Sequence, residues 1–244
     1  MNWLGRIAIQ ILIQLLIAAF IPGTNYGQDS IQIKNGGTIL MLMIVSMLPG
    51  INIPFYHSEM SLLAIEVREG KVTPLFYVLC STLVQIPIVC LTSAVTMALF
   101  HAFGGAPWET FGYTFLIFAV FLFVYEALAE AFSTTGVAAG MMSYMFLVDQ
   151  FNSYNGVYSP IHDSPYPFRF ISAISPPRQM LTAITYLRYS QDSRAYEGAS
   201  QCKWLDTDPY CNAGASFYCP GGQPCFGRTG KEILASLSYQ GFDT

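Results

Sequence analysis

The sequence predicts an all-α, polytopic helical membrane domain, and three observations support this fold class. Hydrophobic residues make up 53% of the 244 residues and charged residues only 11%, whereas soluble domains average about a quarter charged. The charges also avoid long stretches, so that none occurs between Ile7 and Gln28. Five windows meet or approach the roughly 17–25 apolar residues of a helical span. These windows are residues 7–22, 36–56, 74–100, 110–130 and 134–151.

The first window has a second interpretation, because Arg6 precedes its apolar run as a basic residue precedes the core of a signal peptide. Cleavage would require small residues after that run. The sequence has Phe20, Ile21 and Pro22 there instead. We therefore expect a membrane span, with a cleaved signal peptide as the alternative.

The composition changes in the last third of the chain. From Phe168 to Thr244 the sequence is polar and holds seven of the eleven Lys and Arg residues. This divides the chain into residues 1–152, which carry the five spans, and residues 153–244. In the second region, the Pro-rich stretch "SPYPFRFISAISPP" predicts a re-entrant helical hairpin near residues 157–178, followed by an external loop.

Basic residues in short loops tend to stay in the cytosol, and they predict the orientation. Arg6 flanks the first span, and Arg68 and Lys71 lie in the 57–73 segment. Lys34 is the single basic residue of the first loop, at 24–35, and the 101–109 loop has none. The N-terminus and the 57–73 segment are thus expected inside, and the loops at 24–35 and 101–109 outside. The C-terminal region is expected outside, since long loops translocate regardless of charge.

Cysteines mark the expected external loop. This Gly- and Pro-rich loop has no apolar core, so disulfides formed in an oxidising compartment would have to order it. A zinc site is the rival, but the loop contains no Cys-x-x-Cys pair and no nearby His. The pairing stays open among Cys202, Cys211, Cys219 and Cys225. Cys80 and Cys90, in the third span, are expected to be packing residues.

Several function classes lack support in the sequence. No basic run favours nucleic acid as a partner. The stretch "CFGRTGKE" lacks the first Gly and the Ser or Thr of a phosphate-binding loop. The three histidines, His57, His101 and His162, are too scattered to predict a shared metal site. We therefore expect a chain that is not an enzyme and binds no cofactor or metal itself.

Three acids in or near spans are candidates, because ionisable residues inside a membrane are functional by default. Glu126 and Glu130 are four residues apart and share one helix face. We expect both to reach water at the cytosolic interface. Asp149, near the outer end of the fifth span, faces either a substrate cavity or interfacial water. An intramembrane enzyme using these acids is a further alternative, although they are expected at opposite membrane faces.

The segment "FYHSEMSLLAIEVREGKVTPLFYVLCSTLVQIPI" resembles the membrane domain of ATP-binding cassette transporters of the G subfamily, the White and pleiotropic drug resistance group. In that family, the second span ends in an acidic cytosolic helix, and the third span carries a proline. The matching residues are Glu59, Glu66, Gly70 and Pro87. The chain departs at Ile65, where Arg or His is usual, and at Lys71, where an aromatic residue is usual.

Two later segments extend this resemblance. The segment "NGVYSPIHDSPYPFRFISAISPPRQMLTAI" matches the family's glycine step and "P-R" pair, and "CPGGQPCFGRTGKEIL" fits its external loop. The residues concerned are Asn155, Gly156, Pro177 and Arg178, and then Gly230, Glu232 and Leu234. The resemblance would place a nucleotide-binding domain before Met1 and a sixth span after Thr244, and we expect this chain to lack both. A piece of a transporter or a truncated product is therefore expected.

The resemblance implies the membrane-spanning permease part of an ATP-driven transporter for lipids, sterols or amphipathic organic compounds. ATP and Mg would be held by a nucleotide-binding domain in cis or in trans, and a second transmembrane half would complete a homo- or pseudo-dimer. The 57–73 helix would receive the domain's motion through Glu59, Glu66 and Gly70. The plasma membrane or an endomembrane would hold the protein. The alternative is a non-transporting membrane scaffold or assembly partner derived from such a domain.

Methionines are frequent in the second and fifth spans. Flexible thioethers suit promiscuous apolar surfaces, although ordinary packing is their commoner role. The resemblance implies that these spans line a substrate cavity through Met43, Met47, Met145, Asp149 and Asn152. It also implies an outer gate at Gly156, Val157 and Tyr158.

Overall fold

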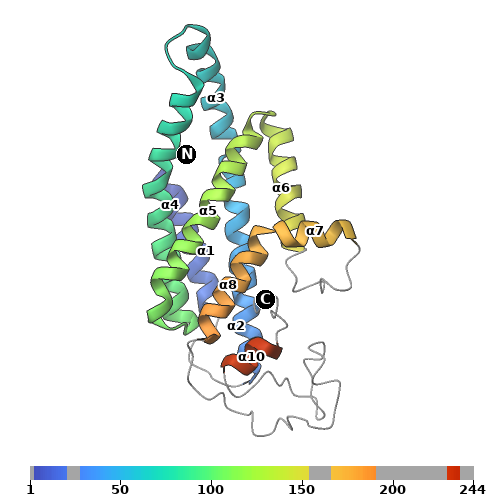
Figure 1. The fold of residues 1–244 in the computed structure, drawn as a ribbon. Coiled ribbons are helices and arrows are strands. Elements are labelled where there is room, and N and C mark those ends of the chain that lie inside the picture. Colours follow the sequence, from blue (N-terminus) through green and yellow to red (C-terminus); the bar gives the residue numbers. More distant parts are fainter. Residues whose placement is uncertain (1–2, 21–27, 154–165, 191–229, 237–244) are drawn as a thin grey trace.

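The computed structural model describes residues 3–20, 28–153, 166–190 and 230–236 (Figure 1). Within these ranges all regular structure is helical, as the sequence predicts. The elements are α1 (Trp3–Phe20), α2 (Gln28–Met47), η1 (Leu48–Asn52), α3 (Ile53–Arg68), α4 (Pro74–Gly104), η2 (Trp108–Thr110), α5 (Phe111–Ser133), α6 (Val137–Ser153), α7 (Tyr166–Ile174), α8 (Pro176–Ser190) and α10 (Gly230–Ser236).

Three helical segments of the described chain are long and apolar enough to cross a membrane by length and composition. They are Ile33–Arg68, Pro74–Gly104 and Trp108–Ser133. Together they support an integral membrane protein. Helices α1 and α6 occupy the first and fifth predicted windows, and their crossing of the membrane stays a prediction.

The first of these segments is one rod in which a short 3-10 helix, η1, joins α2 to α3. The rod contains two prolines that do not end it, because Pro49 and Pro54 lie in the first turns of η1 and α3. A proline there removes no hydrogen bond that the helix needs. The rod therefore carries the chain from one end of the bundle to a tip, the turn at residues 69–73 between α3 and α4. This tip projects beyond the α5–α6 turn (Figure 1).

Helix α5 lies at the centre of the bundle and buries aromatic side chains against its neighbours. Phe118 and Tyr125 are fully buried there, together with Met97 of α4 and Leu42 of α2. Large apolar side chains also cover the outside, as illustrated by Met142, which is 76% exposed. Lipid accounts for this outer surface better than water does, since soluble monomers rarely expose large apolar patches.

Helix α8 is buried although it comes from the stretch that the composition marks as polar. Its residues Met180, Leu181 and Ile184 belong to the same core as α5. Figure 1 shows α8 running along the bundle and α7 running across it. Their junction is fixed by Ser175, whose Oγ donates to the carbonyl oxygen of Phe151 at 2.9 Å.

The predicted re-entrant hairpin overlaps α7 and the start of α8. Its first residues fall within 154–165, outside the described residues, and its entry into a membrane stays a prediction. The four loop cysteines, Cys202 to Cys225, likewise lie outside the described residues. Their disulfides and the external position of that loop are untested.

The topology predicts that the two ends of the bundle face opposite sides of the membrane. Glu66 of α3 and Glu109 of η2 are both exposed. They lie at opposite ends of the bundle, because the 31-residue α4 runs from the turn after α3 to η2. In a protein whose native cysteines are replaced by serine, a cysteine at 109 should react with an impermeant maleimide in intact cells. A cysteine at 66 should react only after the cytosolic face is opened. Labelling of both from one side would contradict this topology.

Candidate functional site

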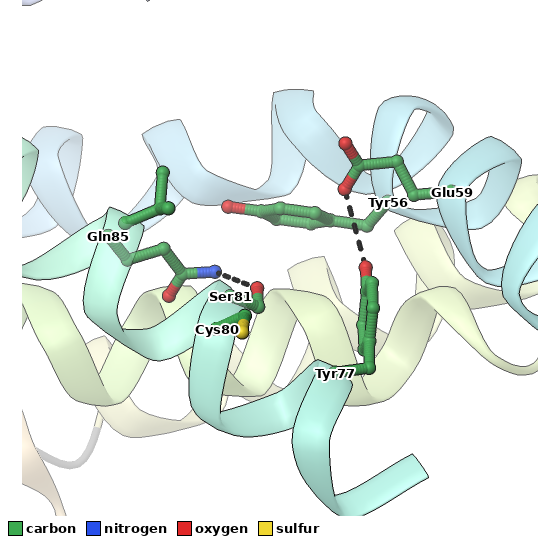
Figure 2. A pocket seen from close by; sticks show the side chains of 7 residues that line it. Tyr56, Glu59, Tyr77, Cys80, Ser81 and Gln85 are labelled. Atoms are coloured by element: carbon green, nitrogen blue, oxygen red, sulfur yellow. Dashed lines mark hydrogen bonds between the residues drawn. The ribbon is translucent and has the colours of Figure 1, made fainter. Parts of the chain in front are cut away.

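A pocket of about 200 Å³ lies between α3 and α4, the two helices that meet at the tip (Figure 2). Tyr56 and Glu59 enter it from α3, and five residues come from α4. Those five are Tyr77, Cys80, Ser81, Val84 and Gln85. Helical spacing explains the set, because residues three or four apart lie on one face of a helix.

Hydrogen bonds join the α4 wall of this pocket to Glu130 of α5. Nε2 of Gln85 donates to Oε2 of Glu130 at 3.2 Å, and Oγ of Ser81 donates to its Oε1 at 3.4 Å. Nε2 of Gln85 also donates to Oγ of Ser81 at 3.3 Å, as Figure 2 shows. Glu130 is thus held by two side chains of one neighbouring helix, which ties α4 to α5.

Glu126 corrects one expectation from the sequence. It does not reach interfacial water, since it is only 1% exposed. The Tyr56 hydroxyl donates to its Oε2 at 2.8 Å, across the interface between α3 and α5. Hydropathy places a residue along a span but does not show which neighbouring helix it faces, and here α3 covers the carboxylate.

The residues expected to couple the membrane domain to a nucleotide-binding domain lie in two different surroundings. Glu66 is exposed near the tip, and Gly70 closes the tip turn with φ of +73°, which favours glycine. Glu59 is half-buried instead and accepts a hydrogen bond from the Tyr77 hydroxyl at 3.5 Å (Figure 2). Of these three residues, Glu66 and Gly70 are exposed at the tip, whereas Glu59 is not.

The residues expected to line a substrate cavity gather mostly at the seam between α2 and α6. Met43, Met47 and Met145 are half-buried and pack against the core. Asn152 is buried, and its Nδ2 donates to Oγ of Ser46 at 3.1 Å. Asp149 is exposed on α6, whereas Glu126 is buried on α5, so the three candidate acids do not share one buried cluster.

The same seam contains contacts that the sequence analysis missed. The Tyr144 hydroxyl donates to the carbonyl oxygen of Ser46 at 2.6 Å. A Cβ at Gly50 would lie 2.8 Å from the Tyr144 ring, so only glycine allows this approach. The Pro-Gly pair at 49–50 is the local signal, but its partner on α6 cannot be read from the sequence. The outer-gate residues Gly156, Val157 and Tyr158 lie outside the described residues.

Arg188 of α8 is a buried cation that the sequence analysis also missed. It is 4% exposed, and its Nη2 donates to the carbonyl oxygen of Gly104 at 3.0 Å. Its Nη1 donates to Oγ1 of Thr38 at 3.4 Å, and its guanidinium lies 4.7 Å from the centre of the Phe100 ring. The side chain therefore joins α8 to α2 and to the C-terminal end of α4.

The model of the ABC-2 type transporter family matches residues 3–189 of this chain. The matched region includes the pocket, the tip, the α2–α6 seam and Arg188. A search of curated proteins found no match.

Proposed function

Because the chain belongs to the ABC-2 type transporter family, we propose that it moves lipids, sterols or amphipathic organic compounds across a membrane. It is the permease part of an ABC-type transporter and is not itself catalytic. The family match over residues 3–189 carries this conclusion. The resemblance of its tip segment, with Glu66 and Gly70, supports placement in the G subfamily.

The α2–α6 seam supports the proposed substrate class. Met43 and Met47 on α2 and Met145 on α6 offer flexible, polarizable side chains that adapt to apolar molecules of different shapes. Asn152 and Ser46 add polar groups to an otherwise apolar region. We propose that a second transmembrane half, in a homo- or pseudo-dimer, completes a cavity on this seam.

The rod formed by α2, η1 and α3 gives a physical route from the tip to that seam. Its tip carries Glu66, and its other half contacts α6 through Ser46 and Gly50. A push on the tip by a nucleotide-binding domain, in cis or in trans, would move α2 against α6. ATP and Mg would be bound by that domain. The bonds to Glu126 and Glu130 connect α3 and α4 to α5, so the same push would also reach α4 and α5.

A substitution at the tip tests this route. Glu66→Ala should lower the stimulation of ATPase activity by transported compounds, because the exposed carboxylate can pair with a basic residue of the nucleotide-binding domain. The protein's abundance should stay unchanged, since exposed ion pairs contribute little to folding. The measurement uses the protein with its nucleotide-binding domain in proteoliposomes, with a fluorescent phospholipid, a sterol and a cationic dye as probes. Glu109→Ala is the matched control, because Glu109 is also exposed but lies beyond the far end of the 31-residue α4.

The result separates the proposal from its alternative. Full stimulation in Glu66→Ala would exclude a coupling role for the carboxylate. Absence of any probe-stimulated ATPase activity in the unsubstituted protein would favour a membrane scaffold or assembly partner that does not transport.

A further inference from the structure

The pocket between α3 and α4 has no part in the proposed substrate seam, and its position relative to the membrane suggests a role of its own. Helix α4 has 31 residues and is about 46 Å long at 1.5 Å per residue. The hydrocarbon core is only about 30 Å thick, so α4 extends into the headgroup layer. Tyr77 and Gln85 lie in the first half of α4, toward the end that extends past the α5–α6 turn (Figure 1). This is the end that we expect to reach the headgroup layer.

The open side of the pocket faces the apolar exterior. Cys80 is exposed at its rim, and Val84 is 57% exposed. Next to them on α4, Leu79 and Leu83 are also exposed. A molecule entering here would keep an apolar tail along these side chains.

The inner walls suit a positive charge. None of the seven lining residues is a cation, and Glu59 supplies a carboxylate. Among the described residues, Glu59 accepts a single hydrogen bond, the long one of 3.5 Å from the Tyr77 hydroxyl. A carboxylate accepts several hydrogen bonds, so it has capacity for an ammonium donor. The Tyr56 and Tyr77 rings add faces that attract cations, as in aromatic sites for quaternary ammonium groups.

The size of the pocket restricts what it holds. Its volume of about 200 Å³ is below the roughly 300–1,000 Å³ of sites that enclose drug-sized ligands. A small headgroup fits, whereas a sterol or a whole dye does not. We propose that this pocket binds the ammonium group of an amine-bearing amphiphile, whose tail stays in the surrounding lipid.

Cys80 makes occupancy measurable without ATP, so the result is independent of transport. The full protein in phosphatidylglycerol nanodiscs is alkylated with N-ethylmaleimide, and modification of Cys80 and Cys90 is followed by mass spectrometry. Dodecylammonium, which carries N–H donors as well as a positive charge, should slow alkylation of Cys80 at least threefold and leave Cys90 unchanged. Dodecanol, which has the tail without the charge, should protect neither cysteine.

Two variants test the role of the carboxylate in the same bilayer. Glu59→Gln should lose the protection of Cys80, whereas Glu66→Gln, also on α3 but exposed at the tip, should keep it. Unfolding temperatures confirm that both variants are folded. If Glu59→Gln does not fold, the contrast between the ammonium compound and dodecanol in the unsubstituted protein still tests whether the pocket binds an ammonium group.

A further arm identifies the source of the ammonium group. Nanodiscs containing phosphatidylethanolamine should protect Cys80 if a lipid headgroup occupies the pocket. Protection only by added dodecylammonium indicates a soluble amphiphile. Equal protection by dodecanol, protection retained in Glu59→Gln, or no protection by either amine would overturn the proposal.

Discussion

Gly140→Ala should cause the largest loss of stability, because the added methyl group has no room. Gly140 lies in the first turn of α6, and a Cβ there would collide with the backbone carbonyl oxygen of Phe132 at the end of α5. A backbone atom cannot rotate away as a side chain can, so the α5–α6 turn would have to open. We expect destabilisation at or above the roughly 1–3 kcal/mol typical of overpacking.

Thermal unfolding of the purified protein measures this effect, and Gly112→Ala is its control. Gly112 is also helical, in α5, but a Cβ there meets nothing within 4 Å. Alanine is the better helix former by about 1 kcal/mol, so this control should unfold at the same or a higher temperature. Equal unfolding temperatures for both variants would contradict the close packing of α5 and α6.

Arg188→Met should produce the second large effect, because it removes a buried charge that holds three helices together. The substitution keeps much of the side chain's length but loses the bonds to Gly104 and Thr38. A hydrogen bond to a charged group contributes about 1.5–3 kcal/mol. The carbonyl of Gly104 ends α4, where the helix dipole also favours a cation.

Surface abundance and unfolding temperature check this prediction in three variants. Arg188→Lys keeps the charge but lacks the planar guanidinium with its several donors. Its surface abundance and unfolding temperature should therefore lie between those of the unsubstituted protein and Arg188→Met. Arg68→Met is the control for loss of charge alone, since Arg68 is exposed at the tip. An unchanged unfolding temperature in Arg188→Met would show that the buried guanidinium does not join the helices.

The long helices could be predicted from the sequence because membrane spans leave a strong compositional signal. The window 74–100 corresponds to α4 at Pro74–Gly104, and 110–130 corresponds to α5 at Phe111–Ser133. Helix α8 leaves a weaker signal, because it mixes buried Leu181 with polar residues and with Arg188. Composition averaged over this stretch hides a buried helix whose polar groups bond to its neighbours.

The candidate site was predictable only in part, because it depends on which helices pack together. The four-residue spacing of Glu126 and Glu130 placed both on one helix face, but the sequence does not show that Tyr56 covers Glu126. Cys80 was expected to pack inside a span, and the structure places it exposed at the rim of the pocket. Local spacing is readable from a sequence, whereas contacts between distant segments are not.

ATP-driven movement of an amphiphile tests the central claim most directly. The protein is purified from its native membrane, so that a nucleotide-binding domain, fused or separate, accompanies it, and is reconstituted into proteoliposomes. We predict that a fluorescent phospholipid, a labelled sterol or a cationic dye crosses the bilayer when ATP and Mg are supplied, and that Glu66→Ala slows this movement. ATP hydrolysis with no movement of any of the three probes, in protein that is folded and correctly inserted, would contradict the account.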